Sequence, residues 1–161
     1  MIEVRHKGMY DLDGIYKAIR RWLTEREYEY NEDRYKDKPA DIGNEVELDM
    51  SGELRVNDFV RFNVKLSAKF YGLKEFEADY MGSKRPVKNG QFFIRVTGTV
   101  TYDYQKKFSS TLAEFFLDLM IKKLLKNYYD VKYVDRLYYD LYTLQTLIKE
   151  QVYMETASNA Y

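Results

Sequence analysis

A chain of 161 residues predicts one domain, which can bury roughly two thirds of the surface that its unfolded form exposes. Its 26 basic and 26 acidic residues cancel, so the net charge indicates no polyanionic partner, and the lack of cysteine excludes disulfides, thiolate metal sites and cysteine nucleophiles. No window approaches the roughly 20 apolar residues of a membrane-spanning helix, and no signal-peptide-like stretch opens the chain, so we expect a cytoplasmic protein without a membrane span.

The N-terminal part of the chain predicts a strand, a helix and a second strand. Residues 1–6 indicate a short edge strand. Asp11 can then cap a helix in which apolar residues recur at helical spacing, and Trp22 is expected to be its central core anchor. Residues 27–38 alternate tyrosines with charged side chains, which predicts a polar edge strand.

The longest alternating segment, DFVRFNVKLSAKF at residues 58–70, predicts a half-buried strand. Its apolar face holds Val60, Phe62, Val64, Leu66, Ala68 and Phe70. Charged and polar side chains occupy the opposite face, because successive side chains of a strand point to opposite sides. One apolar and one polar face are typical of an antiparallel sheet that helices cover on a single side, so this strand predicts an α+β fold.

Further strands are predicted over residues 45–50, 74–80 and 91–104. Ser51 and Gly52 favour a turn after the first of these strands. The segment 81–90 is rich in turn residues, and Pro86 argues against a central strand there. Gly98 interrupts the inward row of the last strand, where glycine favours a bulge or bend that curls a long sheet.

Two helices are predicted after residue 109, where the apolar period changes from that of a strand to that of a helix. Thr111 and Glu114 have the spacing of a capping box at the start of the first helix. The sequence FFLDLMIKKLLKNYY also resembles an interfacial membrane helix, but its N-cap and its place after a long strand favour a helix that covers the sheet. After a break at residues 127–130, the second helix carries an apolar seam formed by Val134, Leu137, Leu141, Leu144 and Ile148, which Tyr138, Tyr139 and Tyr142 flank.

Together these elements predict one α+β domain over residues 1–153 and a frayed tail over residues 154–161. We expect an N-terminal helix, a curved antiparallel meander of about four to six strands, and a long C-terminal helical pair packed on one face. This order is helix-grip-like or hotdog-like by analogy, and a fold analogy carries no function by itself. The sheet has room for only one or two covering helices, so part of the final helix is expected to pack outside the domain and to offer a surface to a partner.

Catalytic signatures are nearly absent from the sequence, which has no P-loop, dinucleotide-binding glycine motif, zinc-binding helix motif or serine elbow. The single histidine, His6, cannot form a histidine-rich metal site and is expected to be solvated. Glu45, Glu47 and Asp49 share one strand face and could bind a hard cation, but such a row is more typical of the solvated face of a sheet. We therefore predict no metal and no cofactor.

A basic row on the outward face of the long strands leaves a nucleic-acid alternative open. It consists of Arg61, Lys65, Lys69 and Arg95. These side chains could present a basic sheet surface to RNA, but the outward aromatic residues that would stack on bases are few, chiefly Phe59 and Phe93. Alternating charge pairs across the strands are the simpler interpretation.

Four phrases are spread over residues 27–150: EYEYNEDRYKDK, ELRVNDFVRFNVKL, FFIRVTGTVTYDYQKKF and DRLYYDLYTLQTLIKE. In these phrases and in their order the chain resembles a small archaeal protein family that has no assigned activity. The resemblance implies an archaeal cytoplasmic origin and one shared architecture, and it implies no mechanism. The matching polar positions are Tyr35, Lys36, Lys38, Arg55, Asp58, Asp103, Arg136 and Tyr139. Arg55 and Asp58 lie near a strand start, where a structural ion pair explains them as well as a site does.

Three functions follow from these patterns. The first is a non-enzymatic interaction or scaffolding module that binds a protein partner or forms a homodimer through Leu137, Tyr138, Leu141, Tyr142, Leu144 and Ile148. The second is a carrier or sensor of a small apolar ligand, with a pocket between sheet and helix that is lined by Phe62, Phe92, Tyr102, Phe115 and Phe116. The third is an RNA- or ribosome-associated factor that uses the basic row. The first requires an exposed seam in the monomer, the second an enclosed apolar cavity of about 300 Å³ or more, and the third an affinity that falls steeply with salt.

Overall fold

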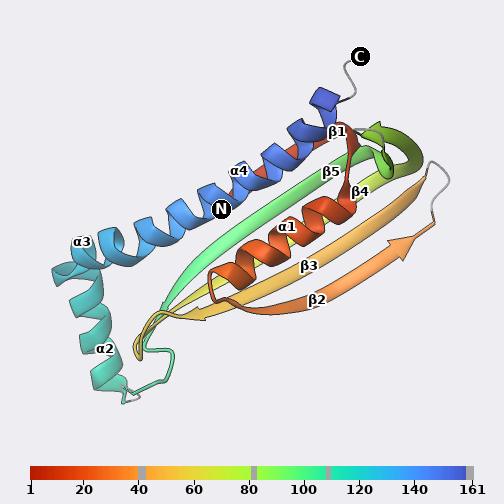
Figure 1. The fold of residues 1–161 in the computed structure, drawn as a ribbon. Coiled ribbons are helices and arrows are strands. Elements are labelled where there is room, and N and C mark those ends of the chain that lie inside the picture. Colours follow the sequence, from red (N-terminus) through yellow and green to blue (C-terminus); the bar gives the residue numbers. More distant parts are fainter. Residues whose placement is uncertain (40–42, 81–82, 108–109, 159–161) are drawn as a thin grey trace.

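A computed structural model describes residues 1–39, 43–80, 83–107 and 110–158, which form an α+β fold (Figure 1). The strands are β1 (Ile2–Tyr10), β2 (Glu29–Lys38), β3 (Asn44–Arg55), β4 (Val60–Tyr80) and β5 (Ser83–Tyr102). The helical segments are α1 (Leu12–Glu25), α2 (Thr111–Leu119), η1 (Met120–Leu124), α3 (Lys126–Tyr129), η2 (Asp130–Val134) and α4 (Asp135–Ser158). The predicted α+β class is confirmed.

The strands form one five-stranded antiparallel sheet in the order β1-β5-β4-β3-β2, so the first strand pairs with the last. The predicted alternation of β4 and β5 is confirmed, because opposite residues such as Leu66 and Val96 bury their side chains on the same face. β2 lies at one edge with nearly every side chain exposed, as its polar pattern predicts. A charged edge strand discourages pairing with other chains. β1 forms the other edge and runs to Tyr10, further than predicted.

The predicted turn at Gly52 is wrong, because β3 continues through this position. A Cβ atom on Gly52 would lie 3.0 Å from the Cδ2 atom of Leu23, so glycine here lets α1 approach the sheet closely. The chain turns instead at Asn57, whose side-chain oxygen accepts hydrogen bonds from the N–H groups of Phe59 and Val60 at 2.9 and 2.8 Å.

Gly98 differs from its predicted role, and the turn-rich segment around Pro86 is part of β5 from Ser83 on, although Pro86 itself avoids a central strand as predicted. Pro86 lies within β5, opposite Glu77 of β4, in a part of β5 that β1 does not reach. This part of β5 is therefore an edge, where the missing N–H of proline costs no bond to a further strand. No register shift occurs at Gly98, where a Cβ atom would lie 2.8 Å from Leu141 and 3.0 Å from Leu137. Glycine here makes room for α4 rather than for a bulge.

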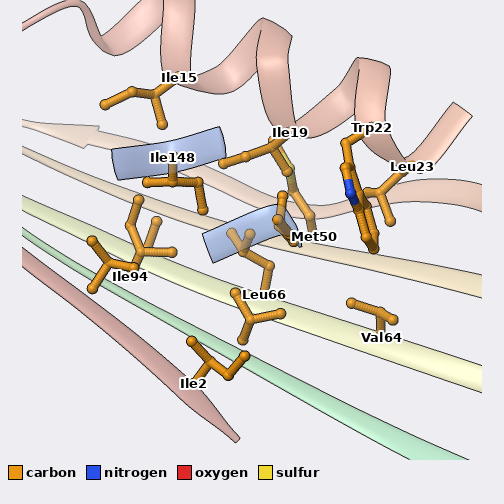
Figure 2. Packing of buried hydrophobic residues seen from close by; sticks show 14 of the residues in the cluster. Ile2, Ile15, Ile19, Trp22, Leu23, Met50, Val64, Leu66, Ile94 and Ile148 are labelled. Carbon is orange, nitrogen blue, oxygen red and sulfur yellow. The ribbon is translucent and has the colours of Figure 1, made fainter. Parts of the chain in front are cut away.

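The core lies between one face of the sheet and the two helices α1 and α4. α1 begins as predicted, since the Asp11 carboxylate accepts a hydrogen bond from the Gly14 N–H at 2.9 Å. Trp22 is buried as predicted, and its indole N–H donates to the Thr143 hydroxyl of α4 at 3.1 Å, which joins the two helices. Figure 2 shows side chains of α1 directed at Met50, Val64, Leu66 and Ile94 of the sheet and at Ile148 of α4.

Only α4 of the C-terminal helices covers the sheet, over β1 and β5 and beside α1 (Figure 1). α2 has no buried side chain and lies away from the sheet, so the predicted covering role of this helix is wrong. The helix left outside the core is thus α2, whereas α4 is buried against the core as far as Val152. α2 is capped by Ser110, one residue before the predicted capping box, through a hydrogen bond from the Ala113 N–H to the serine hydroxyl.

α4 continues as helical backbone to Ser158, into the segment predicted to be frayed, and residues 159–161 lie outside the described residues. Within the described part of the chain, no helix has both the length and the apolar character needed to cross a membrane.

Candidate functional site

The segments α2, η1, α3 and η2 form a bent helical arm, residues 111–134, that projects beyond the end of the sheet (Figure 1). At η1 the Leu125 N–H donates to the Met120 carbonyl, five residues earlier, at 2.8 Å. Such wide turns widen the spacing of residues on one side of a helix and are frequent at functional sites. On the inner side of the arm the spacing is accordingly five residues here, because Ile121 and Lys126 lie one after the other on that side.

A cavity of about 1020 Å³, partly open to solvent, lies between the inner side of the arm, the last residues of β5 and the start of α4. Its apolar lining comes from all three parts: Val100 and Tyr102 from β5, Leu117, Ile121 and Tyr129 from the arm, and Leu137 and Leu141 from α4. Its charged lining consists of Asp103, Glu114, Asp118 and Asp130 with Lys106 and Lys126. The cavity therefore combines an apolar interior with charged groups, among which carboxylates are in excess.

A tyrosine cluster, Tyr102, Tyr129 and Tyr133, fixes the base of the arm to the sheet. The ring centroids of Tyr102 and Tyr129 are 5.2 Å apart and nearly perpendicular, and those of Tyr129 and Tyr133 are 5.7 Å apart. The Asn57 side-chain amide donates to the Tyr133 hydroxyl at 3.3 Å. Burial, and then the negative charge of Asp130, raises the pKa of Tyr102, so this phenol stays neutral at physiological pH. The cluster orders the cavity wall next to β5.

The predicted interaction seam is mostly interior. Leu137, Leu141, Leu144 and Ile148 are buried, so the exposure that an interaction module on this seam requires is not met. Their side chains hold α4 on the sheet, and Leu137 and Leu141 also line the cavity. The tyrosines of the predicted set, Tyr138 and Tyr142, are exposed, and their hydroxyl groups share a hydrogen bond of 2.7 Å.

The residues of the predicted pocket are not brought together. Phe62 and Phe92 are buried in the core between the sheet and its helices. Phe115 and Phe116 are 70% and 63% exposed on α2 and are not among the cavity-lining residues. Tyr102 does line the cavity.

The sequence interpretation missed Leu117 and Ile121, because it assigned the whole apolar arc of α2 to the sheet. A signal was present. Glu114, Leu117, Asp118 and Ile121 follow one another at helical spacing and mix carboxylates with apolar groups, a pattern that suits a cavity wall better than a dry core.

No protein-family model matches the chain, and no curated protein does. The resemblance to the archaeal family therefore stays a prediction.

The charged rows on the outer face of the sheet pair with one another. The pairs join Arg34 and Lys38 to Glu47, Arg61 to Glu53, and Arg95 to Glu3, at 3.0 to 3.4 Å. The hydrogen bond from Lys38 lowers the pKa of Glu47. Arg95 also lies over the ring of Phe93, which occupies the aromatic face that a base would need. Across the described ranges, no group of three or more potential metal-binding side chains occurs.

The predictions for His6 and for the pair of Arg55 and Asp58 are wrong. His6 is half-buried rather than solvated, with its ring centroid 5.6 Å from that of Phe92. Arg55 pairs with Glu29 and Asp58 pairs with Lys107, both at 3.7 Å, so the expected pair between Arg55 and Asp58 is not the one that forms.

Proposed function

We propose that the protein is a non-enzymatic carrier or sensor that binds a small amphipathic molecule in the cavity between the arm, β5 and α4. The cavity carries this proposal, because its volume of about 1020 Å³ accommodates a drug-sized or lipid-sized molecule, for which pockets of roughly 300 to 1,000 Å³ are usual. Apolar side chains from three separate elements converge on it, as ligand pockets generally require.

The charges of the lining favour a ligand with a neutral or cationic polar group. Four carboxylates and two lysine ammonium groups line the cavity, so an anionic ligand would meet net repulsion. Tyr102, Tyr129 and Tyr138 add aromatic rings, whose faces attract cations.

The test is the fluorescence of phenylnaphthylamine, a neutral apolar probe, with displacement by dodecylammonium and by dodecanoate as ligands of equal chain length and opposite charge. We expect the probe to bind and dodecylammonium to displace it at lower concentration than dodecanoate does. Leu117→Trp fills the cavity from the arm and is expected to remove most of the binding. Phe116→Trp is the matched control, because the neighbouring residue is exposed and does not line the cavity. Equal binding by both variants contradicts the proposal.

The other two functions receive less support. The seam of α4 is buried, and two of the four residues of the basic row, Arg61 and Arg95, are paired with acidic side chains. The cytoplasmic location, the homodimer and the archaeal origin remain predictions from the sequence.

A further inference from the structure

The outer face of the arm is apolar and uncovered. Its exposed apolar and aromatic side chains are Leu112, Phe115, Phe116, Leu124, Tyr128 and Val131, none of which is among the residues that line the cavity. Leu112 is 83% exposed, and it shares one side of α2 with Phe115 and Phe116 through spacings of three and four. A helix that is apolar on an open side normally contacts something else there.

Charge is divided between the two sides of the arm. All three acidic residues of the arm, Glu114, Asp118 and Asp130, line the cavity. Lys123 and Lys132 are exposed and do not line it. The outer face is therefore apolar and cationic.

Lys132 is held beside an aromatic ring of this face. Its ammonium group donates to the Tyr128 hydroxyl at 2.8 Å and lies 5.1 Å from the centroid of that ring. The hydrogen bond to Tyr128 raises the pKa of Lys132. A tyrosine with a lysine at its polar tip suits the boundary between headgroups and acyl chains.

We propose that the outer face of the arm binds the surface of an anionic membrane. A helix with exposed leucine and phenylalanine beside lysine lies in the plane of a bilayer, with its apolar side chains at the acyl boundary and its cations among anionic headgroups. A second copy of the chain fits less well, because a two-fold contact through this face brings Lys123 and Lys132 toward their own counterparts. The inference does not depend on the cavity ligand, since the inner and outer sides use different residues.

The test is flotation of the full chain with vesicles of phosphatidylcholine alone or of phosphatidylcholine mixed with phosphatidylglycerol. We expect binding to the mixed vesicles, roughly tenfold weaker binding to the neutral ones, and release by salt. The double variant Phe115→Ser with Phe116→Ser is expected to abolish binding, because it removes two apolar side chains from the outer face. Both side chains are exposed, so their loss leaves the core intact. The double variant Lys123→Glu with Lys132→Glu should weaken binding to the mixed vesicles by roughly tenfold or more.

Two control variants test whether vesicle binding depends on the outer face of the arm rather than on net charge or on the cavity. Lys65→Glu with Lys69→Glu makes the same change in net charge on the exposed face of the sheet and should leave vesicle binding unchanged. Leu117→Trp alters the cavity alone and should also leave it unchanged, so the membrane site and the ligand cavity can fail independently.

Three results overturn the inference. They are a lack of wild-type binding to mixed vesicles, an equal loss for the two lysine pairs, and a native mass by light scattering that falls from dimer to monomer in the phenylalanine variant. The last result would assign the outer face to a second copy. Circular dichroism shows whether the serine variant folds, and if it does not, the lysine pair and its control decide.

Discussion

A substitution at Leu144 tests whether the apolar seam of α4 belongs to the core or binds a partner. Its side chain is fully buried, at 0% exposure, between α4 and the sheet. Leu144→Ala removes three side-chain carbons, which at about 0.8 kcal/mol each gives about 2.4 kcal/mol of lost burial. The cavity left behind raises the expected loss of unfolding free energy to about 3 to 4 kcal/mol.

Urea unfolding can be followed by the fluorescence of Trp22, the single tryptophan, which lies in the core and contacts α4 through Thr143. The melting temperature of Leu144→Ala should fall by roughly 6 to 16 °C, since a chain of this size loses about 2 to 4 °C per kcal/mol. Phe116→Ala is the matched control and should change stability by less than about 0.5 kcal/mol, because that side chain is exposed. A Leu144→Ala variant that keeps its stability but changes its native mass would refute the assignment of the seam to the core.

Two further predictions concern the packing of the sheet and of its buried phenols. Gly98→Ala places a Cβ atom 2.8 Å from Leu141. Overpacking costs about 1 to 3 kcal/mol and removal of a strand glycine gains about 0.5 to 1 kcal/mol, so we expect a loss of about 0 to 2.5 kcal/mol of unfolding free energy. A more stable variant in urea contradicts this. Burial raises the pKa of Tyr10 and of Tyr28, so the unfolded chain releases these protons first as the pH rises through about 10. Stability should therefore fall above about pH 10, and Tyr10→Phe with Tyr28→Phe should flatten that fall in urea unfolding curves measured against pH.

The sequence correctly predicted the elements whose surroundings depend only on residues close to them in the chain. Asp11 begins α1 because its side chain satisfies a backbone N–H within the same turn, and Trp22 is buried because it lies on the apolar side of that helix. β2 is an edge strand because it has no apolar face to bury on either side.

The misread positions are those whose role depends on distant segments. Pro86 is tolerated in β5 because β1 ends before it, which no pattern near the proline reveals. Gly98 is needed because Leu137 and Leu141 pack against it, and these residues come some forty positions later. Periodicity shows that a helix has an apolar side, but it does not show which surface covers that side.

The sheet is covered by α4 and not by α2. This difference explains both the wrong prediction of a covering role for α2 and the proposed functions. α4 presents a narrow seam without carboxylates, and polar side chains beside the seam bond to neighbours: Gln145 donates to the Glu3 carbonyl of β1 at 3.2 Å. α2 is more apolar in composition, but Glu114 and Asp118 lie on its inner side, where contact with the sheet would remove two carboxylates from water. The same carboxylates that keep α2 off the sheet therefore give the cavity its charge, and the remaining apolar side of α2 is left for a surface outside the fold.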